Sequence, residues 1–253
     1  MNASRTHTHD LGRGESMTTE LDIAKPAYDG VAALYDRAFA DIRVRRAEWR
    51  WVTEHLNALD TAPRVLEIGC GTGALLRALS PRISAGTGVD VSGGMIACAE
   101  AALAPRSNLS FQTVSNATLP FESGHFDLVI SFLSFRYLDW PRVMPEIRRV
   151  LSRGGRFWMI DMCAKRAAPS DAPRLARAAL RQLVAPVRTP RFARDLKALT
   201  SHPEWHQMLT QHPSRRFEEY QEFIGYTFPE RPIEVLDVAA RSRVVAFDSG
   251  PLP

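Results

Sequence analysis

Hydrophobic and polar positions follow two different periods along the chain. From about Ala24 to Asp60, apolar side chains recur every three or four positions, which is typical of amphipathic helices. From Arg64 to Met162, short apolar runs alternate with segments of helical period. The pattern predicts strands at 64–68, 86–91, 109–114, 126–132 and 156–162.

The segments between these strands predict helices, such as the one that carries Leu75, Leu76 and Leu79. Strands that alternate with helices imply βαβ crossovers and a mostly parallel sheet. Phe126–Phe132 is apolar around a single serine, and such continuous runs fit a sheet that is covered on both faces. The fold class is therefore α/β.

The alternation stops after Met162. Helical patterns follow at 172–184, 191–209 and 217–225, and strand signals return at 233–238 and 244–247 as a hairpin. We expect a helical lid at 164–228, inserted into a domain formed by 21–163 and 229–253. Residues 1–20 are polar and rich in Thr and His, and we expect them to be a disordered leader.

Composition places the chain among ordinary globular proteins. It has 253 residues, 45% hydrophobic and 24% charged, which fits one α/β domain with an insert. The sequence holds no apolar stretch of membrane-spanning length, so no membrane association is expected. The cysteines Cys70, Cys98 and Cys163 match no zinc spacing and are odd in number. Unpaired cysteines indicate a reducing, cytoplasmic location.

Positive charge is concentrated in the expected lid. The net charge is +4, and between Ala164 and Arg216 eleven Lys or Arg residues face three acidic residues. This surplus fits either a solvated helical face or the attraction of an anionic substrate or partner. RNA binding would rest on this feature alone, so we do not expect a nucleic-acid partner.

A glycine-rich loop follows the first strand and opens a helix. It reads Gly69-Cys70-Gly71-Thr72-Gly73. Glycines permit a tight turn and close approach of a ligand, and free N–H groups at a helix start favour a negatively charged group. The loop also fits the dinucleotide fingerprint, and a purely structural turn is a further alternative.

Two acids flank this loop. Asp90 ends the second strand and is able to accept hydrogen bonds from ribose hydroxyls, a role compatible with either a nicotinamide cofactor or S-adenosylmethionine. Glu67 lies inside the first strand, where a dinucleotide fold usually has an apolar residue. An acid at this position favours a cationic amino acid with a sulfonium group. Ser115-Asn116-Ala117 follows the third strand, in place to meet an adenine edge.

With these motifs, Val65–Asp161 resembles the class I S-adenosylmethionine-dependent methyltransferases. The branch that it resembles most includes ubiquinone- and menaquinone-biosynthesis enzymes and many natural-product methyltransferases. The resemblance implies a Rossmann-like seven-stranded sheet, mostly parallel, with an antiparallel last strand, and S-adenosylmethionine as cofactor.

The resemblance also implies roles for individual residues. Residues around the methionine part would come from the first strand and its loop, those around the adenosine from the second and third strands, and Ser131 would lie near the donor methyl. Tyr35 belongs to a Tyr-Asp segment that would close over the cofactor. Asn116 replaces an acid found in many relatives. The full set of cofactor-binding candidates is Tyr35, Glu67, Gly69, Cys70, Gly71, Gly73, Asp90, Val91, Asn116, Ala117 and Ser131.

Catalytic residues are harder to identify, since the methyl donor is already activated and the protein mainly aligns the acceptor. Arg136 and Tyr137 follow the fourth strand, and Arg136 is a candidate to hold a substrate carboxylate or phosphate. His202 and His206 lack a third metal ligand, so no metal is expected. His206 is instead our candidate for a catalytic base.

The sequence therefore predicts a methyltransferase that acts on a small molecule, either aromatic or anionic, by in-line methyl transfer. An S-adenosylmethionine-binding regulator or partner subunit without transferase activity is the alternative. A nicotinamide oxidoreductase has less support, because no catalytic set for hydride transfer stands out. The expected partner is the small-molecule acceptor, and a homodimer is compatible with the sequence.

Overall fold

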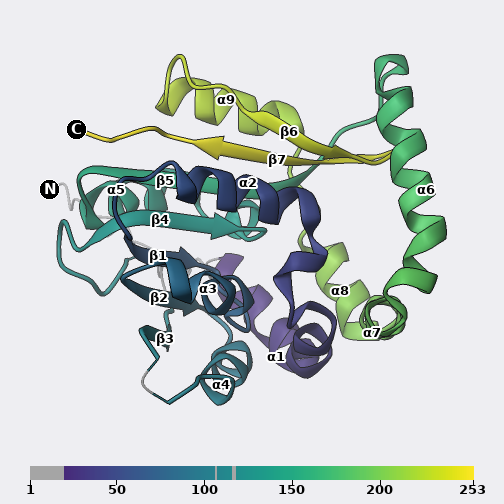
Figure 1. The fold of residues 1–253 in the computed structure, drawn as a ribbon, viewed down its shortest axis with the longest axis horizontal. Coiled ribbons are helices and arrows are strands. Elements are labelled where there is room, and N and C mark those ends of the chain that lie inside the picture. Colours follow the sequence, from purple (N-terminus) through teal and green to yellow (C-terminus); the bar gives the residue numbers. More distant parts are fainter. Residues whose placement is uncertain (1–19, 106, 116–117) are drawn as a thin grey trace, which may run out of the picture.

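The computed structural model describes residues 20–105, 107–115 and 118–253. At its centre lies a seven-stranded sheet in the order β3-β2-β1-β4-β5-β7-β6 (Figure 1). Strand β7 runs antiparallel to both of its neighbours, and the other pairs are parallel. This confirms the expected sheet. The strands are β1 (Arg64–Ile68), β2 (Ala85–Asp90), β3 (Leu109–Thr113), β4 (Phe126–Phe132), β5 (Leu151–Ala164), β6 (Glu234–Val238) and β7 (Ser242–Asp248).

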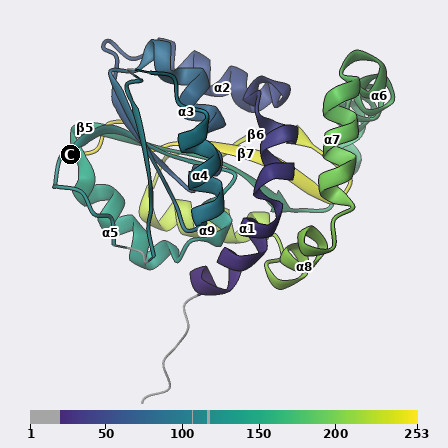
Figure 2. The ribbon, with the colours of Figure 1, turned by 90° about the horizontal axis from the view of Figure 1, so that it is seen from below.

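Helices cover both faces of the sheet, as the apolar strands predict. Figure 2 shows α2 and α3 on one side of the sheet and α5 and α9 on the other. Each face has its own cluster of buried side chains, which includes Trp158 on one side and Trp140 on the other. These helices are α2 (Arg46–Asn57), α3 (Ala74–Leu79), α4 (Gly93–Ala101), α5 (Trp140–Val150) and α9 (Phe217–Thr227).

A third cluster lies beyond the ends of the strands. Helix α1 (Glu20–Phe39) packs there against α7 (Pro190–Thr200) and α8 (Pro203–Gln211). Val31 and Phe39 are buried against Leu199, with Trp205 beside them. Helix α6 (Ala172–Arg188) leads from β5 to this group (Figure 1). Within the described residues, no helix is long and apolar enough to cross a membrane.

The expected insert is helical, but its last helix packs against a different part of the protein. Helix α9 packs on the sheet, and Tyr220 is fully buried against the same cluster as Trp140. Helices α7 and α8 separate at Ser201 and His202, just before Pro203. Proline lacks an N–H and suits the first turn of a helix. The domain boundaries at 164 and 228 stay a prediction.

Strand β5 is longer than its sequence pattern predicts. It begins at Leu151, which pairs with Phe126, and a register shift follows before Leu128 pairs with Arg156. Gly154, with φ of 79°, lies inside this irregular part of the strand. Glycine accommodates such irregular pairing because it adopts a positive φ without strain.

We expect Gly73→Ala to destabilise the protein. Gly73 has φ of 72°, and an added Cβ would lie 2.5 Å from the Phe111 ring. Left-handed backbone strain and overpacking together cost about 2–4 kcal/mol. Urea unfolding measures this loss, and Gly93→Ala is the control because its added Cβ has no neighbour within 4 Å. Equal stability of the two variants would contradict this account of the turn.

Candidate functional site

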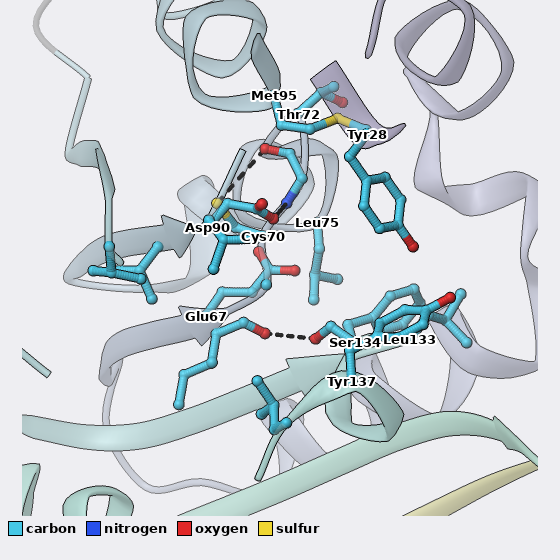
Figure 3. A pocket seen from close by; sticks show the side chains of 18 of the residues that line it. Tyr28, Glu67, Cys70, Thr72, Leu75, Asp90, Met95, Leu133, Ser134 and Tyr137 are labelled. Atoms are coloured by element: carbon cyan, nitrogen blue, oxygen red, sulfur yellow. Dashed lines mark hydrogen bonds between the residues drawn. The ribbon is translucent and has the colours of Figure 1, made fainter. Parts of the chain in front are cut away.

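A cavity opens at the carboxyl ends of β1, β2 and β4, beneath α1. In parallel α/β sheets, ligands bind at this edge of the sheet. Figure 3 shows the acids Glu67 and Asp90 on one side of this cavity and Ser134 and Tyr137 on another. Strands β1 and β4 are neighbours in the sheet, so residues more than 60 positions apart in the chain meet here.

The glycine loop forms the floor of the cavity. Gly69, Gly71 and Gly73 all have positive φ, a conformation that glycine adopts without strain. The N–H groups of Gly69 and Cys70 both donate to the Val89 carbonyl oxygen, at 2.8 and 3.0 Å. The loop is thereby tied to β2, and Gly69, Cys70, Gly71 and Thr72 line the cavity.

Glu67 is the most unusual charged group of the site. Its side chain is buried, and its Oε2 atom has no hydrogen-bond partner. Burial and the nearby Asp90 carboxylate raise the pKa of Glu67 well above its usual range, although the backbone of Leu76 acts in the opposite direction. A buried acid without a partner is costly, and a cationic ligand in the cavity would satisfy it.

Asp90 joins the two loops beside the cavity. Its Oδ2 accepts from the Gly71 N–H at 2.8 Å, and its Oδ1 accepts from the Ser92 N–H at 2.9 Å. Each carboxylate oxygen keeps a second acceptor position. Burial raises the pKa of Asp90, while the hydrogen bonds from Ser92 and Gly71 oppose this. The position suits hydroxyl donors of a ribose.

Helix α1 closes the cavity from above. Tyr28 and Tyr35 line it, and the ring of Tyr35 packs on Phe39 with a centroid separation of 4.8 Å. Asp29 holds the helix in place, since its carboxylate accepts from the Ser92 hydroxyl and from the Gly94 N–H at 2.9 Å. Tyr35 thus lines the cavity, and its expected role next to the ligand stays a prediction.

The end of β4 forms the opposite wall. Leu133 has φ of 58°, which is strained for a branched side chain and often occurs at functional sites. Ser134 follows, lines the cavity and donates to the Ile68 carbonyl oxygen at 2.6 Å. Ser131 is fully buried within 2.8 Å of the Ser134 hydroxyl and does not line the cavity. Sequence reasoning chose Ser131 and missed Ser134.

The acceptor-side candidates have different positions. Tyr137 lines the cavity. Arg136 lies behind it and forms an ion pair with Asp161 at 2.9 Å. His206 is exposed on α8 and does not line the cavity. Val91 lines the cavity, whereas Gly73 supports the loop from beneath. Asn116 and Ala117 lie outside the described residues.

Thr72 is a further residue that sequence reasoning did not single out. Its hydroxyl is buried without a hydrogen-bond partner and lines the cavity. Its position inside the glycine loop could have identified it from the sequence. Glu67 Oε2 and Thr72 Oγ1 are unpartnered polar atoms on one side of the cavity, so these residues fit a ligand with a cationic amino-acid end.

The comparisons with known proteins agree with this geometry. Residues 66–159 match the model of the methyltransferase domain family. A phosphatidylethanolamine N-methyltransferase from Cereibacter sphaeroides is 32% identical over 159 residues, which are 60% of this chain and 74% of the relative. The chain belongs to the S-adenosylmethionine-dependent methyltransferase family. The expected family and, with it, the expected cofactor, S-adenosylmethionine, are thereby confirmed.

Other matches are partial or structural. A demethylmenaquinone methyltransferase from Clavibacter sepedonicus is 30% identical over 131 residues, 51% of this chain and 54% of the relative. The chain thus spans about half the length of that relative. The [4+2]-cyclase SpnF has a TM-score of 0.57 at 20% identity and is covered over its whole length, together with 95% of this chain. That likeness shows a shared fold.

We expect Asp90→Ala to weaken binding of S-adenosylmethionine by about tenfold or more, because charge-assisted hydrogen bonds to the ribose are lost. Calorimetric titration measures the affinity. The control is Glu100→Ala, which removes an exposed acid from α4. Unchanged affinity in the Asp90 variant would show that this carboxylate only joins the two loops.

Glu67→Gln is expected to have opposite effects on stability and binding. The pKa of Glu67 is raised in the folded state, so ionisation costs stability as pH rises from the unfolded pKa towards the folded one. Removing the charge should raise the Tm of the free chain at neutral pH by about 2–4 °C. The same change should weaken S-adenosylmethionine binding. Loss of both stability and affinity would contradict this role.

Proposed function

We propose that this chain transfers a methyl group from S-adenosylmethionine to a small-molecule acceptor. The observation that carries the proposal is a single cavity with two unlike ends. One end holds the acids Glu67 and Asp90, and the other is walled by Tyr28, Ser134 and Tyr137. Acids suit the cationic and ribosyl parts of the donor, and the tyrosine wall leaves a separate compartment for an acceptor.

The reaction requires little covalent chemistry from the protein. S-adenosylmethionine, when bound, supplies a methyl group already activated on a sulfonium. The chain has to place the acceptor in line with it, which is a matter of position and orientation. Glu67 and Asp90 hold the donor side, whereas Tyr28 on α1 and Tyr137 after β4 contact each other and form one wall beside the acceptor (Figure 3).

The names of two relatives support a small acceptor. One relative is a phosphatidylethanolamine N-methyltransferase and another is a demethylmenaquinone methyltransferase. We infer a small aromatic or anionic acceptor from the aromatic wall and the basic insert. A cytoplasmic location is supported by Cys70, Cys98 and Cys163, which are all free.

A binding protein without transferase activity is the second candidate. The observation in its favour is the similarity to the [4+2]-cyclase SpnF over 95% of this chain, whose name describes a different reaction. Under that alternative, the cavity would bind S-adenosylmethionine, but no acceptor would be methylated.

The test is formation of S-adenosylhomocysteine, followed by mass spectrometry, with a panel of phenols, quinols, amines and carboxylic acids as acceptors. We expect turnover with at least one member. For that acceptor, Tyr137→Ala should lower kcat/KM by about tenfold or more, since the acceptor loses its wall, and should leave S-adenosylmethionine affinity unchanged.

Tyr226→Ala is the matched control, because Tyr226 is 90% exposed and should have no effect. Tight binding of S-adenosylmethionine without turnover across the panel would favour the second candidate. Loss of donor affinity in the Tyr137 variant would show that the residue belongs to the donor side of the cavity.

A further inference from the structure

The acceptor end of the cavity carries almost no charge of its own. Among the described residues that line the cavity, the charged ones are Glu67, Asp90 and Asp139, and none is Lys, Arg or His. Glu67 and Asp90 lie at the donor end. Asp139 accepts from the Arg142 N–H as the cap of α5, and its carboxylate also pairs with the Arg142 guanidinium at 3.3 Å. An anionic acceptor would find no cation within this lining.

One cation does lie directly behind the wall. The Arg136 guanidinium carbon is 4.7 Å from the centre of the Tyr137 ring. Burial raises the pKa of Tyr28 and Tyr35 on α1, and the charge of Arg136 acts in the opposite direction on both, although Arg45 has a larger effect than Arg136 on Tyr35. Without a counter-ion, the charge of Arg136 would therefore make the electrostatic potential across the acceptor compartment more positive.

Asp161 balances that charge. Its Oδ1 accepts from Arg136 Nη1 at 2.9 Å, and its Oδ2 accepts from the Arg136 backbone N–H at 2.6 Å. The Tyr220 hydroxyl donates to Oδ2 at 2.8 Å, and the Met162 N–H donates to Oδ1 at 2.7 Å. Asp161 is fully buried and Arg136 is 12% exposed. The pair is thus held firmly and adds no net charge.

The positive charge of Arg136 is well supported. Burial alone would lower the pKa of Arg136, but the Asp161 carboxylate and the neighbouring Tyr137 and Tyr28 together raise it. A buried ion pair is weak evidence for stability, since a pair of apolar residues often does as well. The presence of the pair directly behind a ligand wall therefore calls for a role other than stability.

The wall itself suits a ring. Tyr28 and Tyr137 meet edge to face, with ring centroids 6.0 Å apart, and Tyr35 lines the same cavity. Aromatic side chains prefer such offset or edge-on contacts with another ring. A planar, uncharged molecule would contact these rings without losing hydration of a charged group.

We propose that Asp161 is a specificity-determining residue: by neutralising Arg136 behind the Tyr28–Tyr137 wall, it restricts the acceptor compartment to uncharged, ring-bearing molecules and excludes anions. This rests on the proposed function and deepens it, because it chooses between the aromatic and the anionic acceptor. Asp161 does not line the cavity, so it acts through Arg136 and is not a catalytic residue.

The test compares two probes that share a ring and differ in charge. Naphthalenemethanol and naphthoate, substituted at the same ring position, are titrated calorimetrically into the chain saturated with S-adenosylhomocysteine. All titrations use one buffer of about pH 8, in which the carboxylate probe is fully ionised. We expect the wild-type chain to bind the alcohol about tenfold tighter than the carboxylate.

Asp161→Asn should remove the preference for the alcohol over the carboxylate. Arg136 is left without its counter-ion, so naphthoate affinity should rise by about tenfold, while affinities for the alcohol and for S-adenosylhomocysteine stay within about threefold. A merely structural role predicts losses and no such gain. The double variant Arg136→Gln/Asp161→Asn should again prefer the alcohol. Tyr220→Phe, which keeps both charges, should behave like the wild type.

Three results would overturn the proposal: equal or tighter naphthoate binding by the wild type, no binding of either probe, or an unchanged ratio in a folded Asp161→Asn variant. If that variant does not fold, the wild-type ratio and the double variant decide. Failure of the proposed function is a separate result, since it would appear as absence of turnover across the acceptor panel, whatever the affinity ratio of the two probes.

Discussion

The hydrogen bond from the Gly71 N–H to Asp90 joins the turn after β1 to the turn after β2. It forms because three glycines place the backbone in left-handed conformations that other residues would strain. The same turn directs Glu67 and Asp90 towards one cavity and brings Gly69 against Ser134 after β4. Strand order, loop shape and the positions of both acids therefore depend on one short segment of backbone.

Local patterns made the sheet and the donor end of the site predictable. Apolar runs marked every strand, and Glu67 and Asp90 stood at fixed places relative to the glycine loop. The acceptor end was harder to predict from the sequence, because its residues are brought together only by tertiary packing. Nothing near Asp161 in the sequence indicates that Tyr220, 59 positions away, donates to it. His206 was chosen as a candidate base for its side-chain chemistry, which does not say which helix face points to the cavity.

The two ends of the cavity are built from different parts of the fold. The donor end comes from the strand ends and their loops, which the family model covers within residues 66–159. The acceptor end takes Tyr28 from α1, and the Arg136–Asp161 pair behind it takes a hydrogen bond from Tyr220 on α9. Both tyrosines lie outside the matched segment. A shared sheet accordingly constrains the donor end more than the acceptor end, because one fold can host different sites.

Helix α1 covers the cavity but packs mainly on α4, α7 and α8. Its Asp29 carboxylate reaches the start of α4, and its Gly30 lies against the Glu204 side chain of α8. A bulky ligand that passes α1 would have to displace these few contacts, whereas the sheet beneath could stay as it is. Substitutions on α1 would therefore change the rate of ligand exchange without changing the stability of the core.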